Sequence, residues 1–134
     1  MGRRAVRCLI VDDSAEFRDA ARAMLTRAGI DVVAVAANIA DALRYSRELE
    51  PDVALVDVDL GGENGFDLAE QLDRSGLPTA PAVILVSTYA EQDLAEMLAV
   101  SPAIGFVSKI SLSATAIRNL LGADRGPVSE PRGR

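Results

Sequence analysis

Five short apolar runs recur along the chain, and the four gaps between them and the stretch after the last carry apolar residues at helical spacing. The runs are rich in Val, Leu and Ile, which is typical of strands buried in a parallel sheet. We expect strands over residues 6–11, 30–36, 53–57, 82–87 and 104–108. The regular alternation of strand and helix predicts an α/β protein with helices on both faces of the sheet.

Polar residues and glycines mark where the intervening helices begin and end. We expect helices over residues 15–28, 38–48, 66–74, 90–100 and 113–121. Ser14 is placed to cap the first helix, Asn38 or Asp41 the second, and Ser111 or Ser113 the last. Gly122 is expected to end the last helix. We therefore expect one domain over residues 1–122 and a disordered tail over 123–134, which is rich in Gly, Pro and charged residues.

Carboxylates stand directly after two of the apolar runs. Asp57 closes the third run, and Asp12 and Asp13 follow the first. Parallel strands deliver such residues to one sheet edge, where open α/β sheets bind ligands. Several carboxylates there would form a site for a hard cation, with a nucleophile among them. Each acid alone is equally well explained as a turn residue or a helix cap, but together with Lys109 they favour a functional site.

Composition narrows the possible functions. The 134 residues suit one domain, and 49% of them are hydrophobic, which is enough for a full core. The net charge of −6 argues against direct nucleic-acid binding, and no run approaches the ~20 apolar residues of a membrane span. The absence of histidine excludes Ser-His-Asp and His-based metal chemistry. Cys8 is the one cysteine, so no internal disulfide forms, which fits a reducing cytoplasm.

These features, in this order, resemble the receiver domain of two-component response regulators over residues 6–121. Five pieces carry the resemblance, each at the end of or on an expected strand: the acid pair Asp12-Asp13, then Asp57, Ser87, Phe106 and Lys109. The resemblance implies a flavodoxin-like (βα)5 three-layer sandwich with a parallel sheet of order 2-1-3-4-5. In that order the first and third strands are neighbours and flank the point where the topology opens a crevice.

The resemblance also implies a magnesium site. Asp13 and Asp57 would bind Mg²⁺ through their side chains, Asp59 through its backbone carbonyl, and Asp12 mainly through water. Carboxylates crowded together repel one another, by roughly 4 kcal/mol per pair at 4 Å and an effective dielectric constant near 20. A divalent cation removes that repulsion and keeps the carboxylates ionised.

The remaining implied roles concern the phosphoryl group. Asp57 would accept it from the phosphohistidine of a sensor histidine kinase, and Lys109 and the Ser87 hydroxyl would share the charge on its oxygens. Ser87 would then move, and Phe106 would rotate inward and alter the face formed by the fourth helix, fifth strand and fifth helix. Taken alone, Phe106 is more simply explained as a core residue.

The sequence departs from the family pattern at four places. Ile110 stands where a cis proline often follows the lysine, so we expect a different loop geometry there. Gly61-Gly62 replaces a loop that often contains proline, and we expect a looser turn. Phe106 replaces a tyrosine and has no hydroxyl. Thr88 follows Ser87 where many members have a smaller residue, which would narrow access to Asp57.

We expect a protein that catalyses only its own phosphorylation and dephosphorylation in the cytoplasm. Its output would pass to an unknown downstream protein or to a missing effector domain, and it would be a monomer or weak dimer. Two alternatives remain. Asp57-Val58-Asp59 also resembles the nucleophile motif of haloacid-dehalogenase-type phosphatases, although there the motif normally ends the first core strand. The second alternative is a receiver-like interaction module that acts without phosphorylation.

Overall fold

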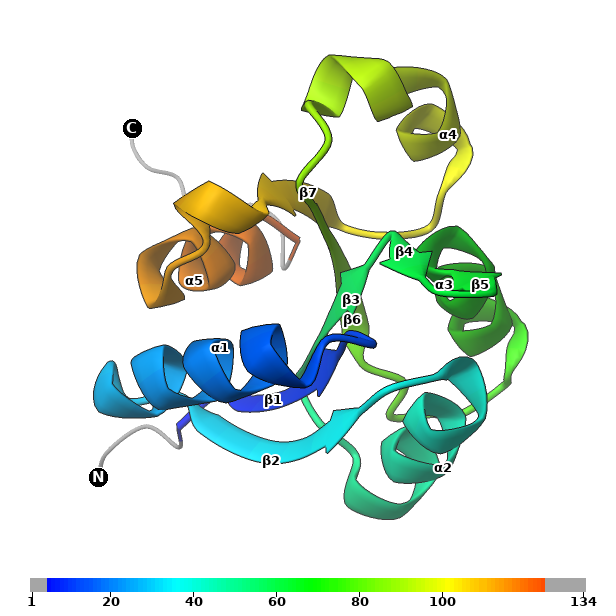
Figure 1. The fold of residues 1–134 in the computed structure, drawn as a ribbon. Helices are drawn as coiled ribbons and strands as arrows, with labels where there is room; N and C mark the ends of the chain where they lie inside the picture. The colour runs from blue at the N-terminus through cyan, green and yellow to red at the C-terminus, as the bar shows by residue number, and fades with distance from the viewer. Residues whose placement is uncertain (1–4, 125–134) are drawn as a thin grey trace, which may run out of the picture.

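The computed structural model describes residues 5–124 and shows a parallel sheet enclosed by helices (Figure 1). The strands of the main sheet are β1 (Arg7–Val11), β2 (Asp31–Ala36), β3 (Val53–Asp57), β6 (Ala82–Ser87) and β7 (Gly105–Ser108). The α-helices are α1 (Ala15–Arg27), α2 (Ile39–Leu49), α3 (Gly65–Arg74), α4 (Ala95–Val100) and α5 (Ala114–Asp124). None of the helices in this part of the chain is long and apolar enough to cross a membrane. Most of the predicted tail, residues 125–134, lies outside the described residues.

The sheet has the order β2-β1-β3-β6-β7, and every neighbouring pair is parallel. This confirms the predicted order, since β6 and β7 are the fourth and fifth strands of the sheet along the chain. Helices α1 and α5 cover one face, and α2 and α3 cover the other (Figure 1). Strand β3 lies in the middle and is buried along its whole length. Its last residue, Asp57, pairs with Val86 of β6, and Val56 before it pairs with Val11 of β1.

The two faces of the sheet pack two separate apolar cores. On one face Leu9, Val56 and Leu85 meet residues of α2 and α3, and on the other Ile10 and Leu55 meet residues of α1 and α5. Cys8 belongs to the second core and is fully buried. Burial raises the pKa of its thiol to about 12, so Cys8 is a packing residue.

Side-chain caps fix the beginnings of four helices. The N–H of Phe17 donates to Ser14 Oγ (3.2 Å), that of Asp41 to Asn38 Oδ1 (2.8 Å) and that of Ala116 to Ser113 Oγ (3.0 Å). These caps confirm Ser14 and resolve the two open alternatives in favour of Asn38 and Ser113. Asn64 caps α3 in the same way and was not predicted.

The predicted helix over residues 90–100 is not one continuous helix. A 3-10 turn, η1 (Glu91–Leu94), precedes the six residues of α4, and neither segment has a side-chain cap. Ala90 has no oxygen with which to cap the turn, and no residue of either segment is buried. Met97 and Val100 remain 47% and 78% exposed. The segment therefore stands away from the sheet (Figure 1). The prediction that Gly122 ends the last helix is also wrong, because α5 runs on through Gly122 to Asp124.

The predicted loose turn after Asp57 is also wrong. Residues Asp59–Leu60 (β4) and Glu63–Asn64 (β5) pair antiparallel in a short hairpin. Gly61 has a φ of +76°, which glycine adopts without the strain of a side chain. Glu63 Oε1 accepts the N–H of Ile39 at 3.0 Å and so ties the hairpin to the start of α2. Gly61-Gly62 therefore closes a tight turn rather than a loose one.

Gly65, the first residue of α3, lies against the end of β3. Its N–H donates to the carbonyl oxygen of Val58 at 2.8 Å. A Cβ at this position would collide with the backbone carbonyl of Asp57 and would lie 2.8 Å from Val56 Cγ1. The close approach of α3 to β3 thus depends on a residue without a side chain.

We expect Gly65→Ala to lower the free energy of unfolding by about 1 to 3 kcal/mol, because overpacking against backbone cannot relax cheaply. Helix propensity alone predicts the opposite sign. Urea denaturation would measure the change. Gly62→Ala is the matched control, since a Cβ there meets nothing within 4 Å, and it should stay within about 0.5 kcal/mol of the parent. A Gly65→Ala protein as stable as the parent would contradict the steric account.

Candidate metal and phosphoryl site

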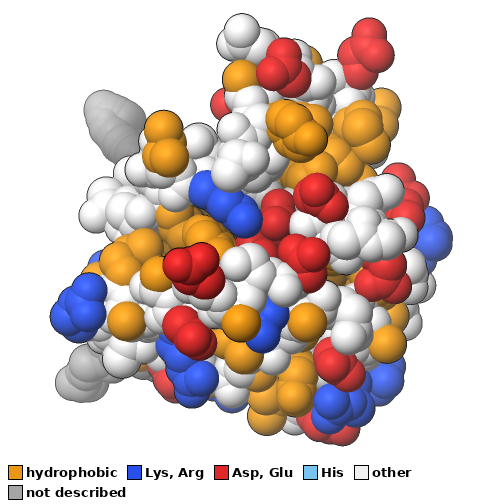
Figure 2. All heavy atoms as spheres, in the orientation of Figure 1, with side chains coloured by type: hydrophobic (Ala, Val, Ile, Leu, Met, Phe, Trp, Pro, Cys, Tyr) orange, Lys and Arg blue, Asp and Glu red, His pale blue; other side chains and the backbone are white. Residues whose placement is uncertain are grey.

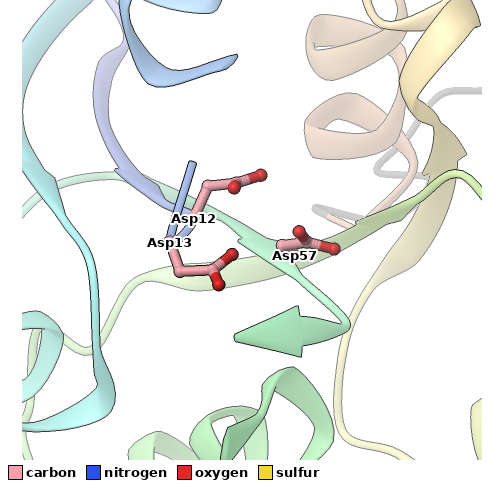
Figure 3. A group of neighbouring side chains, drawn as sticks. All are labelled: Asp12, Asp13 and Asp57. Atoms are coloured by element: carbon pink, nitrogen blue, oxygen red, sulfur yellow. The ribbon is translucent and has the colours of Figure 1, made fainter. Parts of the chain in front are cut away.

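Three carboxylates meet at the carboxyl edge of the sheet (Figure 3). Asp12 and Asp13 follow β1, and Asp57 ends β3, which is the neighbouring strand. One oxygen from each lies within 4.8 Å of the others. Asp12 and Asp57 are buried, whereas Asp13 is exposed. Figure 2 shows acidic side chains gathered near the centre of this face, next to a basic group. The structure therefore brings together the three acids that the sequence placed at one edge.

Asp12 is held at every polar atom for which the structure gives a contact. Oδ1 accepts the N–H of Ser14 at 2.8 Å, and the backbone carbonyl accepts a guanidinium N–H of Arg18 at 2.7 Å. Oδ2 lies 2.8 Å from Lys109 Nζ. This last contact has the geometry of an ion pair rather than of a directed hydrogen bond, since Oδ2 has no hydrogen-bond partner among the described residues. Asp12 is thus a fixed negative charge beside the acceptor candidate.

Asp57 faces the same lysine. Its Oδ2 lies 3.1 Å from Lys109 Nζ, and its Oδ1 accepts the N–H of Asp59 at 3.1 Å. Burial raises the pKa of the Asp57 carboxyl to about 6, and the nearby charge of Asp12 also raises it. The Asp59 N–H and the Lys109 ammonium pull in the opposite direction. Without a metal ion, the ionised form of Asp57 therefore costs free energy even beside Lys109.

Lys109 bridges the two buried acids from the end of β7. Its side chain is only 17% exposed. Burial lowers the pKa of the ammonium, but the contacts with Asp12 and Asp57 outweigh that effect and raise it above its usual value. The nitrogen also lies 4.2 Å from the centre of the Phe17 ring. Ile110 follows it with 93% exposure, so the absence of proline has not kept Lys109 from the site.

Ser87 ends β6, the strand next to β3, and is buried. Its Oγ accepts the N–H of Tyr89 at 2.9 Å. Thr88 is exposed. Of the two hydroxyls, Ser87 is thus the one held at the sheet edge. The register pairs it with Ser108, the residue before Lys109, which puts both predicted phosphoryl contacts at the same edge.

Asp59 and Phe106 lie outside the carboxylate cluster. Asp59 is exposed, and its Oδ1 accepts the N–H of Gly61 at 3.1 Å inside the hairpin. Phe106 is half-buried on β7 and lines a hollow of about 190 Å³ together with Leu98 of α4. The hollow leaves room beside the ring.

The donor set suits a hard divalent cation. Three carboxylates offer oxygen ligands, and Mg²⁺ uses one or two of these together with waters and phosphoryl oxygens. Gly61 adds a close backbone wall, because a Cβ there would lie 3.2 Å from Asp13 Oδ2. Asp13 faces solvent, so the cluster is open on this side to a cation or a phosphodonor. The residues present therefore fit the metal that the resemblance implies.

Two features of this site were not foreseen from the sequence. The first is the direct ion pair between Lys109 and Asp12, and the second is the Phe17 ring over the same ammonium. Phe17 lies in the first turn of α1. No local signal reveals either contact, because both join residues more than ninety positions apart in the sequence.

We expect the stability gap between Asp57→Asn and the parent to depend on pH. The folded-state pKa of Asp57 is raised, so the folded parent binds an extra proton between pH 4 and 6 and loses stability as the pH rises through that window. Asparagine does not titrate. The variant should gain about 2 kcal/mol relative to the parent between pH 4.5 and pH 7.5 in the absence of divalent cations.

Urea denaturation at the two pH values would measure the gap. Asp73→Asn, at an exposed acid of α3, is the control and should stay within about 0.5 kcal/mol of the parent at both pH values, as a surface substitution does. A stability gap that is the same at both pH values would show that the pKa of Asp57 is not raised in the folded protein.

Comparison with known proteins agrees with this geometry. Residues 8–121 match the family model of the response regulator receiver domain. The chain is 37% identical over 90 residues to the sensory transduction protein LytT of Bacillus subtilis, covering 66% of this chain and 36% of that protein. It is 36% identical over 121 residues to protein-glutamate methylesterase/protein-glutamine glutaminase 5 of Myxococcus xanthus, covering 89% of this chain and 34% of that protein. The chain thus spans about a third of the length of these relatives.

A solved structure shows the same fold. The signal receiver domain of NarL from Mycobacterium tuberculosis superposes with a TM-score of 0.79 at 28% identity, and the match covers 93% of this chain and all of that one. The family match covers all five strands of the main sheet except the first residue of β1. It also includes all three residues of the carboxylate cluster. The chain therefore belongs to the response regulator receiver domain family of two-component signalling.

Proposed function

We propose that Asp57 accepts a phosphoryl group from the phosphohistidine of a sensor histidine kinase. The observation that carries this proposal is the convergence of Asp12, Asp13 and Asp57 on one point, with Lys109 bridging two of them. Membership of the receiver family supports it, because receiver domains are phospho-acceptors. The same membership speaks against the phosphatase alternative, in which the aspartate motif would end the first strand and not the third.

The transfer is a displacement at phosphorus. An oxygen of the Asp57 carboxylate forms a bond to the phosphorus, and the bond from phosphorus to the donor's imidazole nitrogen breaks, leaving its electron pair on that nitrogen. Lys109 is already beside the nucleophile, so its ammonium is placed to offset charge on the phosphoryl oxygens. The Ser87 hydroxyl would donate to another of these oxygens.

We also propose a metal role for four aspartates, as the family resemblance implies. Asp13 and Asp57 would hold Mg²⁺ through carboxylate oxygens, Asp59 through its backbone carbonyl, and Asp12 through water. When bound, the cation supplies charge neutralisation for the carboxylates and the phosphoryl oxygens. The Asp59 side chain lies outside the carboxylate cluster and accepts the N–H of Gly61 through Oδ1, so the role that the resemblance gives this residue would belong to its backbone carbonyl.

The wider role follows from the family. The chain would catalyse only its own phosphorylation and dephosphorylation in the cytoplasm, and an effector domain or a downstream protein would carry the output. Its short match to longer relatives supports an output outside this domain. The exposed acids of η1 and α4 (Glu91, Asp93 and Glu96) have no basic residue beside them in these two segments, so we propose no firm dimer contact there, only a monomer or weak dimer.

Phosphorylation would act as a switch through Ser87 and Phe106. An acyl phosphate at Asp57 attracts the Ser87 hydroxyl away from the N–H of Tyr89, which it now accepts. Phe106 would then turn inward into the space that Ser87 vacates, and the hollow that the ring lines with Leu98 shows that its present surroundings are not tightly packed. Because no residue of α4 is buried, α4 is the element whose position such a change would shift.

We expect incubation with acetyl phosphate and Mg²⁺ to add the mass of one phosphoryl group to the protein, as measured by intact mass spectrometry. Chelation of the metal should prevent the addition, because the carboxylates then repel one another and the incoming anion. Asp57→Asn should abolish it. Asp59→Asn is the matched control, since it changes a neighbouring acid but keeps the backbone carbonyl, and it should still be modified. An unmodified parent would favour the phosphorylation-independent alternative.

We expect a beryllofluoride adduct, which mimics the phosphoryl group, to shift the amide signal of Tyr89 in an NMR spectrum, because Ser87 Oγ leaves its N–H. Signals of α4 and the Phe106 ring should shift with it. Ser87→Ala, which has no hydroxyl to move, should lose the Tyr89 response. Identical Phe106 and α4 signals with and without the adduct would contradict the switch.

A further inference from the structure

Phe17 contacts the lysine of the site from the first turn of α1. The centre of its ring lies 4.2 Å from Lys109 Nζ. The ring is half-buried and packs at the margin of the core that α1 and α5 share. Its backbone N–H donates to Ser14 Oγ, so the cap that begins the helix also fixes the backbone from which the ring projects. The position of Phe17 is thus fixed independently of Lys109.

The surroundings of the ammonium explain why a ring matters there. Lys109 has three N–H donors, and the carboxylates of Asp12 and Asp57 lie 2.8 and 3.1 Å from the nitrogen. With the side chain only 17% exposed, little water reaches it. A buried cation without solvation is costly unless another group replaces the water. The face of an aromatic ring carries negative charge density and attracts a cation within about 6 Å.

We propose that Phe17 is a positioning residue for Lys109: its ring holds the ammonium beside Asp57 and so supports the phosphoryl transfer. The inference rests on the function proposed above. An aliphatic side chain at this position would fill the same space but offer no partner to the ammonium. Lys109 would then sample positions away from Asp57, and the transfer would slow.

The simpler explanation is that Phe17 only packs α1 against the core. The two explanations differ in which substitutions matter. If packing is the role, Phe17→Leu is a mild change, comparable to a substitution elsewhere on the same helix face. If the ring face is the role, Phe17→Leu is harmful while Phe17→Tyr, which keeps the ring, is not.

The experiment measures the rate at which acetyl phosphate and Mg²⁺ phosphorylate the full chain. In this reaction an Asp57 oxygen bonds to phosphorus, the bond from phosphorus to the acetyl oxygen breaks, and acetate leaves with the electron pair. We expect Phe17→Leu to lower the rate roughly two- to fivefold, the effect of a partly exposed cation–π contact. Phe17→Tyr should stay within about twofold of the parent.

Met24→Leu is the matched control. Met24 lies two turns further along α1, is half-buried and packs on the same core, but is too far along the helix to reach the site. Its substitution should leave the rate unchanged. A second readout is the NMR signal of the Lys109 side chain, whose protons lie over the ring and should be shifted upfield in the parent and in Phe17→Tyr. Phe17→Leu should abolish that shift.

A double-mutant cycle tests whether Phe17 acts through Lys109. In a Lys109→Met background, Phe17→Leu should cause no further loss of rate. The inference is overturned if Phe17→Leu reacts as fast as the parent, if Met24→Leu slows the reaction equally, or if the loss persists without Lys109. If the parent itself takes no phosphoryl group, the proposed function fails, and the Lys109 signal still decides whether the ring holds the lysine.

Discussion

Two buried carboxylates, Asp12 and Asp57, lie beside each other at the sheet edge, and one ammonium stands between them. In water such charges would be solvated separately, but here Asp12 is almost fully buried and Asp57 nearly so. Lys109 lies 2.8 Å from one and 3.1 Å from the other, which offsets part of their mutual repulsion. The offset is incomplete, since the pKa of Asp57 still rises to about 6. The fold therefore maintains an acid cluster whose charge is only partly balanced.

Several parts of the fold serve to keep these groups in place. Strands β1 and β3 are neighbours, so their carboxyl ends deliver Asp12 and Asp57 to adjacent positions. The close approach of Gly65 to the end of β3 and the hairpin that follows Asp57 fix the backbone on the other side. Lys109 arrives from β7, at the far edge of the sheet, and its long side chain spans the intervening strand β6. A cluster built from three strands in this way is a property of the topology rather than of any local sequence.

The parts of this structure that the sequence predicts are those determined by local pattern. The apolar runs gave all five strands of the main sheet to within one residue at each end, because burial on both faces requires continuous Val, Leu and Ile. The three acids were predicted to converge because parallel strands end at one edge. The prediction failed where local signals are weak or ambiguous. The segment over residues 91–100 has no side-chain cap and divides into the 3-10 turn η1 and the short helix α4. Gly61-Gly62 allows a tight hairpin as readily as a loose loop. Contacts of Lys109 with Asp12 and Phe17 depend on packing between distant segments and have no counterpart in the sequence pattern.

The charge of the site bears on how the proposed phosphorylation of Asp57 would affect the rest of the domain. Three carboxylates and one ammonium leave a formal charge of −2, which a single divalent cation cancels. Conversion of the Asp57 carboxylate to an acyl phosphate then replaces one negative charge with about two. The added charge lies where Lys109 already contacts Asp12 and Asp57. A neutral hydrogen-bond donor nearby would therefore move to meet the new phosphoryl oxygens. In the proposed switch Ser87 is that donor, because it is buried on the adjacent strand and its Oγ accepts the N–H of Tyr89. Because the segment that follows Tyr89 leads directly into η1 and α4, which have no buried residue, a small motion at Ser87 meets the least resistance in that direction.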